Sequence, residues 1–371
     1  IWVVLNWPAK GHAHTVDVPW VPGLSMDITL RFDSLAAIMS VLVLAIGALV
    51  LFYCAEYFHH HDGHTEKRLP SFAAELVAFS GAMFGLVVSD NMLMLYIFWE
   101  TTTVLSFLLV GHYAERATSR RAATQALLVT TLGGLAMLVG IIVLGQLAGT
   151  YLLSELIAAP PTGTAATAGI ALILVGALSK SAIVPLHFWL PGAMAAPTPV
   201  SAYLHAAAMV KAGIYLVGRL APSMYEVATW HVVVISLGVF TMLLGGWMAL
   251  KQRDLKLILA YGTVSQLGFI TSIMAVGSRE AMQAGLALTF AHSLFKAALF
   301  MVVGAIDHCS GTRDITKLSG LGRRQPFLYV IALISALSMA GVPPLFGFVS
   351  KEAVLESTMH EELLIGMPRN M

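Results

Sequence analysis

Residues 177–211 read ALSKSAIVPLHFWLPGAMAAPTPVSAYLHAAAMVK, a stretch in which two lysines and two histidines interrupt apolar sequence. An ionisable group at the depth of a bilayer costs at least ~2.5–3.5 kcal/mol, so it normally has a partner or lines a polar path. Pro185 follows Lys180 closely, and its ring and missing N–H predict that the helix ends near this lysine. Broken backbone at membrane depth persists only where protein buries it or water reaches it. The stretch therefore predicts an interrupted helix beside a buried proton carrier in an ion-translocating membrane protein.

The composition of the whole chain is that of an integral membrane protein. Of its 371 residues, 58% are hydrophobic and 11% are charged, whereas soluble domains carry roughly 25% charged residues. The net charge is +1 and the basic residues are spread over the loops, which argues against nucleic acid as a partner. The two cysteines, Cys54 and Cys309, have no spacing typical of a metal site or a disulfide framework. Because the chain begins at Ile1 and not at a methionine, we expect that it is a fragment and that the full polypeptide continues beyond both of its ends.

Ten apolar stretches predict ten transmembrane helices and therefore an all-α polytopic membrane protein. Most stretches have about 20 residues or more, the length that a helix needs to cross ~30 Å of hydrocarbon. Lys and Arg number twelve in one set of alternate loops and four in the other, which places the first set on the cytoplasmic side. The predicted spans are 35–58, 72–89, 91–113, 122–148, 165–186, 199–219, 228–250, 255–276, 281–307 and 327–349.

Two of these stretches carry similar breaks. Residues 177–186 match residues 336–345 at five of ten positions, including a proline. The matching stretches belong to the fifth and tenth spans. Spans that are an odd number of crossings apart run through the membrane in opposite directions, as in inverted-topology repeats. A chance match of short apolar sequences is the alternative. We expect helix breaks at Pro185 in one half and at Pro343 and Pro344 in the other. The predicted parts are residues 1–71 with a loop and the first span, 72–220 as the first five-helix repeat, and 228–371 as the second, truncated repeat.

Glu100 is an acidic residue near the middle of the third predicted span, and three threonines follow it. One interpretation is a structural carboxylate that is hydrogen-bonded to these threonine side chains. The other is a carboxylate whose protonation depends on a nearby lysine, for which Lys180 is the candidate. At ~6 Å and an effective dielectric constant near 20, the attraction between these two charges is about 3 kcal/mol. That is enough to switch the protonation state.

Further ionisable side chains follow in later spans. His205 is either a satisfied core histidine or a proton relay, since histidine titrates near neutrality. Lys211 lies six residues later, about 240° around a continuous helix, and therefore faces another neighbour. His292 and Lys296 stand at positions i and i+4 and project from one helix face. The predicted proton path comprises Glu100, Lys180, His205, Lys211, His292, Lys296 and Lys351.

Asp90, His187 and Glu352 are secondary candidates. Asp90 lies at the end of a span, where capping is the default role, and Glu352 adjoins Lys351 and could neutralise its charge. The histidines of residues 59–64 lie in a predicted cytoplasmic loop, where such side chains are usually solvated. We therefore predict no metal site and no cofactor.

Motifs run along nearly the whole chain: Phe98-Trp99-Glu100 and residues 180–202, 259–268, 291–297 and 341–345. These motifs resemble the proton-pumping antiporter-like subunits shared by respiratory complex I and the Mrp multisubunit cation/proton antiporters. The resemblance implies two inverted five-helix repeats with broken helices. Within this family, residues 32–36 and 209–213 resemble the large A-type component of the Mrp antiporters most. Thr101 and Gly192 depart from the family pattern, which has a leucine and a polar or acidic residue there. The resemblance places Glu100, Lys180, His205, His292, Lys296 and Lys351 on the family's proton path.

The resemblance implies a transporter subunit, not an enzyme, that exchanges a monovalent cation for H⁺ under the proton motive force, with Na⁺ as the expected cation and K⁺ as the alternative. It also implies other membrane subunits as partners and a multi-pass location in the lipid bilayer of a bacterial inner membrane. The alternative is the proton-pumping subunit of an NADH:quinone oxidoreductase. A purely structural scaffold is disfavoured by the number of ionisable groups within apolar sequence.

Overall fold

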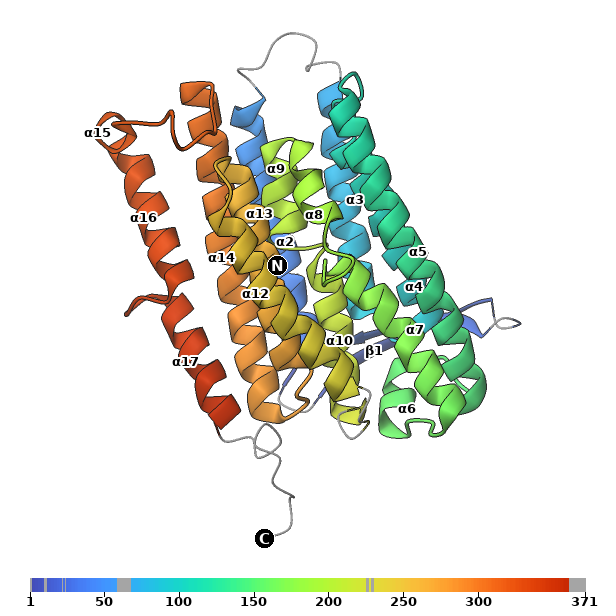
Figure 1. Cartoon of the computed structure of the whole chain (residues 1–371). Coiled ribbons are helices and arrows are strands. Elements are labelled where there is room, and N and C mark those ends of the chain that lie inside the picture. The colour runs from blue at the N-terminus through green and yellow to red at the C-terminus, as the bar shows by residue number, and fades with distance from the viewer. Residues whose placement is uncertain are drawn as a thin grey trace. The chain divides into compact units, whose positions relative to one another are not determined.

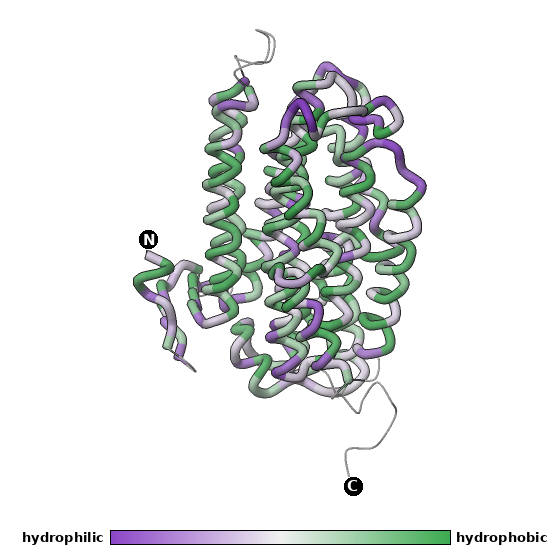
Figure 2. The backbone as a smooth tube through the Cα atoms, turned by 90° about the vertical axis from the view of Figure 1, so that its left-hand side faces the viewer, coloured by the Kyte–Doolittle hydropathy of each residue, from purple (hydrophilic) through white to green (hydrophobic). Residues whose placement is uncertain are grey.

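The computed structural model describes residues 2–9, 12–21, 23, 25–58, 68–224, 227 and 230–359. Seven helical segments in these ranges are long and apolar enough to cross a membrane (Figure 1). Hydrophobic residues predominate along them (Figure 2). The predicted helical, polytopic membrane fold is thus confirmed. The seven segments are α2 (Ser34–Tyr57), α3 (Leu69–Val88), α4 (Met92–Val110), α5 (Ala117–Ala148), η5 with α12 (His231–Ile235 and Ser236–Leu250), α13 (Leu255–Met274) and α14 (Arg279–Ser310).

The remaining elements are shorter and cluster at the helix breaks and in the connections. The chain forms two compact units, Ile1–Leu216 and Val217–Met371. The repeat boundaries expected from the sequence stay a prediction. The shorter helices are α1 (Trp2–Leu5), α6 (Leu153–Ala158), α7 (Thr164–Lys180), α8 (Trp189–Gly192), η3 (Ala193–Ala195), α9 (Thr198–Val200), η4 (Ser201–His205), α10 (Lys211–Met224), α15 (Leu321–Arg324), α16 (Pro326–Ala340) and α17 (Phe346–Met359).

A β-hairpin that was not expected from the sequence precedes α2. Strands β1 (His14–Val21) and β2 (Met26–Phe32) pair in antiparallel register. The hairpin is anchored through β2, because the backbone N–H of Asp90 donates to the carbonyl of Thr29 at 2.9 Å. The hairpin has too few apolar residues to resemble a membrane span. The pattern of side chains along one short strand does not show which other segment it pairs with, so the hairpin was not expected.

The first unit contains the break predicted near Lys180. Helix α7 ends at this residue, and Ala182 adopts a left-handed conformation with φ 53°. The predicted continuous helix over residues 199–219 is wrong. There α9 and the π-helical η4 are separated from α10 by turns at residues 206–210. In this gap the carbonyl of Val210 accepts from Ser181 Oγ, and the carbonyl of Ala206 accepts from the Lys211 ammonium.

The second unit has a break of the same local form between α16 and α17. The backbone N–H of Val342 donates to Leu337 O at 3.0 Å, and at the aligned place Ile183 N–H donates to Leu178 O at 3.0 Å. Gly341 has φ 87° at the position that aligns with the left-handed alanine of the first unit. The peptide bonds Val184–Pro185 and Pro343–Pro344 are both cis. The matched hydrogen bonds and the left-handed residues at aligned positions support a repeat of the broken helix, and its inversion stays a prediction.

Candidate functional site

Lys180 lies fully buried at the end of α7, where its ammonium group binds α4. Nζ donates to the carbonyl of Trp99 at 2.6 Å, to Thr102 Oγ1 at 2.6 Å and to Thr103 Oγ1 at 3.0 Å. It also lies 4.6 Å from the centroid of the Trp99 ring, within range of a cation–π interaction. The cost of burying this lysine is therefore offset by a dedicated set of acceptors. We call Trp99 O, Thr102 Oγ1 and Thr103 Oγ1 the lysine cradle.

The local sequence explains why the cradle forms on one turn of α4. Threonine side chains in a helix bond back to the carbonyls three or four residues earlier. Thr102 and Thr103 both do so, and both reach Trp99 O, at 2.7 and 3.2 Å. The two hydroxyls therefore stand beside the same carbonyl, facing α7. Thr101 has the other orientation, because it is exposed and bonds to Ile97 O at 2.7 Å.

Glu100 shares α4 with the cradle but does not join it. Among the described residues, Glu100 and Lys180 influence each other electrostatically without forming an ion pair. Glu100 Oε1 is buried and has no hydrogen-bond partner in the described part of the chain. It lies against Gly134 of α5, where an added Cβ would overlap this oxygen. The threonines that follow Glu100 thus bind Lys180 and not Glu100. The carboxylate of Glu100 lies in the space that the missing side chain of Gly134 leaves open.

His205 is the last residue of the π-helical η4, which follows the break after α7, and it is fully buried. Its ring packs edge-on against Trp189, with 6.1 Å between the ring centroids. Trp189 Nε1 donates to the carbonyl of Ser179 at 2.9 Å, next to the buried lysine of α7. The indole therefore connects the end of α7 with the π-helical segment, and the histidine lies close to the break.

Lys211 is fully buried at the start of α10, and its ammonium donates to the carbonyl of Ala206. The segment before it is fixed to the first break, because Ser181 Oγ donates to Val210 O at 2.8 Å. Gly213 allows a close approach, since an added Cβ would meet Ala177 O and Ser181 Oγ. The predicted 240° separation of Lys211 from His205 is wrong because the helix between them is interrupted. The structure brings both residues to the region of the α7 break.

In the second unit, His292 and Lys296 lie on one face of α14, as the spacing predicted, and both are fully buried. Lys296 Nζ donates to the carbonyl of Leu259 on α13 at 3.0 Å. It passes close to Gly262, where an added Cβ would come within 2.8 Å of Nζ. The glycine keeps room for the ammonium group between the two helices.

Lys351 reaches the second break from α17. It is half-buried, and Nζ donates to Met339 O at 2.6 Å, just before α16 ends. In the sequence alignment of the two breaks, Met339 stands where the first unit has Lys180. The second break therefore receives its ammonium group from the following helix. Glu352 is exposed, and it forms no ion pair with Lys351 in the described residues.

The secondary candidates have local roles or no contact with these groups. The carboxylate of Asp90 accepts from Ser154 N at 3.0 Å and from Ser154 Oγ at 2.5 Å, so it caps the start of α6. His187 is half-buried beside Phe188. No group of three or more His, Cys, Asp or Glu side chains in the described ranges could hold a metal ion. The histidines of residues 59–64 lie outside the described residues.

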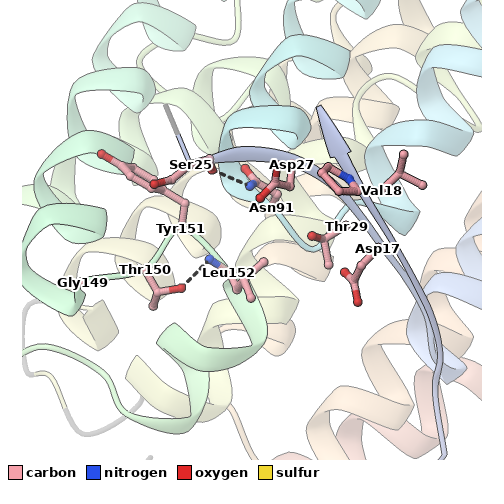
Figure 3. A pocket seen from close by; sticks show the side chains of 11 residues that line it. Asp17, Val18, Ser25, Asp27, Thr29, Asn91, Gly149, Thr150, Tyr151 and Leu152 are labelled. Atoms are coloured by element: carbon pink, nitrogen blue, oxygen red, sulfur yellow. Dashed lines mark hydrogen bonds between the residues drawn. The ribbon is translucent and has the colours of Figure 1, made fainter. Parts of the chain in front are cut away.

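An open pocket of about 440 Å³ lies beside the β-hairpin (Figure 3). The carboxylates of Asp17 and Asp27 come from the hairpin, and the connection between α5 and α6 forms another part of its lining. The Asn91 amide donates to Ser25 O at 2.9 Å across this region. None of the predicted proton-path residues lines the pocket.

The sequence did not lead us to expect Thr102 and Thr103 as acceptors for Lys180 or Trp189 as a neighbour of His205. The available signal for the acceptors was the run of three threonines within an apolar span, which one of the two interpretations paired with Glu100. No sequence pattern indicated the tryptophan contact, because it joins residues from two sides of the break. Buried lysines and histidines next to irregular backbone can take up and release protons along hydrogen-bonded and water-filled routes.

Comparisons with known proteins show which family and which proteins the chain is similar to. Residues 89–367 match the family described as "NADH:quinone oxidoreductase/Mrp antiporter, TM", and residues 20–67 match the N-terminal part of chain 5 of NADH-ubiquinone oxidoreductase (complex I). A probable A/B subunit of a K⁺/H⁺ antiporter from Rhizobium meliloti is 45% identical over 96% of this chain and 35% of its own length. The A-type component of a Na⁺/H⁺ antiporter from Alkalihalophilus pseudofirmus is 43% identical over 91% of this chain and 44% of its own length.

Solved structures with a similar fold include the Mrp complex from Dietzia sp. DQ12-45-1b. Its matching chain has a TM-score of 0.89 and 40% identity, over 96% of this chain and 39% of that chain. An archaeal membrane-bound sulfane sulfur reductase matches with a TM-score of 0.82 and 25% identity, over 92% of this chain and 69% of that chain. The chain thus spans less than half the length of the antiporter proteins described above.

Proposed function

The chain belongs to the membrane-spanning family shared by NADH:quinone oxidoreductase and the Mrp antiporters, and we propose that it works in a multisubunit antiporter. In this proposal it is a transporter subunit that moves protons in exchange for Na⁺ or K⁺, driven by the proton motive force. Other membrane subunits are its partners, and its place is the plasma membrane of a bacterial cell. The relatives named as components of antiporters support this assignment.

The observation that carries the proposal is the fully buried Lys180 at the end of a broken helix, with Glu100 nearby. A lysine that served only packing would be expensive at this depth, since an apolar side chain of similar size needs no acceptors. A lysine that exchanges protons needs this environment, because burial and a neighbouring carboxylate make its charge responsive to small movements. The interrupted backbone supplies the site at which such movements are possible.

Within the first unit, the proposed proton route runs from Glu100 and Lys180 to His205 and the region of Lys211. The contact of His205 with Trp189, which bonds to Ser179, supports this order. Within the second unit, His292 and Lys296 form one segment of the route and Lys351 forms its end. Lys296 and Lys351 each bond to a backbone carbonyl, an acceptor that stays uncharged when the lysine releases its proton.

A second candidate function is proton pumping within an NADH:quinone oxidoreductase. The match of residues 20–67 to the N-terminal part of chain 5 of complex I favours it. The same buried groups serve both functions, and the difference lies in the driving reaction. An antiporter responds to Na⁺ or K⁺, whereas a respiratory pump responds to NADH.

The test uses vesicles that contain the complete complex, with a pH gradient followed by a fluorescent probe. We expect added Na⁺ or K⁺ to collapse the gradient without NADH, and Lys180→Ala to abolish this response while the complex still assembles. Lys251→Ala is the matched control, because Lys251 is exposed and its ammonium lies over the ring of Trp247 on the preceding helix turn. If the pH gradient changes only when NADH is added, and not with Na⁺ or K⁺, the respiratory function is the correct one. Normal exchange in Lys180→Ala would refute the proposed mechanism.

A further inference from the structure

The lysine cradle satisfies the ammonium group of Lys180 completely. An ammonium has three N–H donors and no acceptor, and the structure provides three acceptors at 2.6, 2.6 and 3.0 Å. The two threonines are fully buried, and the lysine is as well. The charged form of the side chain is therefore held without any bond to the carboxylate of Glu100.

The same cradle also suits the neutral form of the side chain. Each threonine hydroxyl accepts from Nζ and donates its own hydrogen to the carbonyl of Trp99. A neutral amine has a lone pair that needs a donor. A hydroxyl can rotate and supply one, whereas a carbonyl or an ionised carboxylate cannot. When Nζ loses a proton, one hydroxyl can thus turn its hydrogen toward the new lone pair, and this hydrogen stays bonded to its own oxygen.

The geometry points to Thr102 and Thr103 as positioning residues for proton exchange: we propose that they hold Lys180 in place in both its charged and its neutral form. The inference rests on the proposed function, in which this lysine exchanges protons, and adds two residues to it. A pair of hydroxyls that switch between accepting and donating keeps Nζ at one position through the cycle. Glu100 then acts on the lysine through its charge across a short distance.

Replacing a buried threonine by alanine would leave a gap and disturb the packing. Valine is the more informative replacement, because it keeps the β-branched shape and removes only the hydroxyl. The variants are Thr102→Val, Thr103→Val and the double change, in the complete complex in vesicles. Thr101→Val is the matched control on the same helix, because Thr101 is exposed and its hydroxyl is bonded to the carbonyl of Ile97. Thr102→Ser is the conservative variant, since it restores a hydroxyl.

We expect each valine variant to assemble and to shift the pH of half-maximal antiport to lower pH by up to about one unit, because the lost bond to the charged ammonium is stronger than the lost bond to the neutral amine. The serine variant should keep the wild-type pH profile, and so should Thr101→Val. A threonine with only a packing role would change the amount of complex without moving the pH profile.

Unchanged pH profiles in both single valine variants and in the double variant, with wild-type amounts of complex, would overturn the inference. If the valine variants do not assemble, Thr102→Cys provides the same test, because its thiol bonds weakly, and an unchanged profile would again overturn it. Failure of the proposed function is a separate outcome. In that case the wild-type complex itself shows no exchange of Na⁺ or K⁺ for protons.

Discussion

Replacing Gly134 by alanine tests whether the position of the Glu100 carboxylate matters for transport. An added Cβ would overlap Glu100 Oε1 and lie 3.0 Å from Cδ, and its three nearest neighbours all belong to this side chain. The end of a flexible side chain can move away, so we expect the carboxylate to shift by at least about 1 Å to relieve this overlap. The cost of this shift is partly offset by the higher helix propensity of alanine, about 1 kcal/mol.

The effect on transport follows from the displaced charge. At an effective dielectric constant near 20, a change of ~1 Å in a charge separation of ~6 Å changes the attraction between a carboxylate and an ammonium group by about 0.4 kcal/mol. This difference alone corresponds to roughly a twofold change in an equilibrium. A displacement of 1 Å in a group that exchanges protons can cost up to ~10²-fold in rate. We therefore expect Gly134→Ala to lower antiport by between about twofold and ~10²-fold with little change in thermal stability.

The assay is the decay of a pH gradient in vesicles, together with the melting temperature of the purified complex. Gly81→Ala is one control, since an added Cβ there meets no described atom within 4 Å, and both activity and stability should be retained. Gly133→Ala is the other control. Its Cβ would collide with the Ser179 side chain and come within 3.3 Å of the Val175 backbone, so stability should fall. Wild-type rate and pH dependence in Gly134→Ala would refute the reasoning about Glu100.

Three further changes have expected outcomes. Lys296→Met should abolish antiport and leave assembly intact, because Nζ is fully buried against the Leu259 carbonyl; vesicle assays beside Lys251→Met check this, and retained exchange would contradict it. Asp90→Asn should keep activity and lower stability by about 1 kcal/mol, measured by melting, because the bonds to Ser154 lose their charge. Burial lowers the pKa of His112 below its ordinary value of 6.5, and the nearby cation Arg68 lowers it further. The unfolded chain then binds a proton that the folded chain does not, so stability should fall as pH drops below ~6.5, and His112→Phe should flatten this dependence in melting curves.

The breaks are the part of the site that could be predicted best from sequence. Pro185 and the Pro343-Pro344 pair are local signals, because a proline removes a backbone donor and disturbs the preceding turn wherever it stands. Helix α7 accordingly ends at Lys180, and the tenth stretch divides into α16 and α17. The burial of the ionisable residues was also accessible, since it follows from the apolar sequence around them.

The interruption before Lys211 could not be predicted in the same way. Residues 206–210 read AAAMV, which is compatible with a helix, and no proline lies among them. In the folded chain, the Lys211 ammonium and the Ser181 hydroxyl bond to carbonyls of this interrupted segment. The bond from Ser181 exists only after the end of α7 and the start of α10 have packed together, so a local pattern does not reveal it.

The amino-acid sequence by itself determined that this protein is a polytopic helical membrane protein with two broken helices and a series of buried lysines and histidines. Hydropathy, helix length and proline act over a few residues, so these features are readable along the chain. Only the tertiary structure decided which groups meet: Lys180 binds the hydroxyls of Thr102 and Thr103, and Glu100 lies beside Gly134. The physical reason is that a hydrogen bond depends on position within a few tenths of an ångström, and such positions are set by the packing of helices that are distant in sequence.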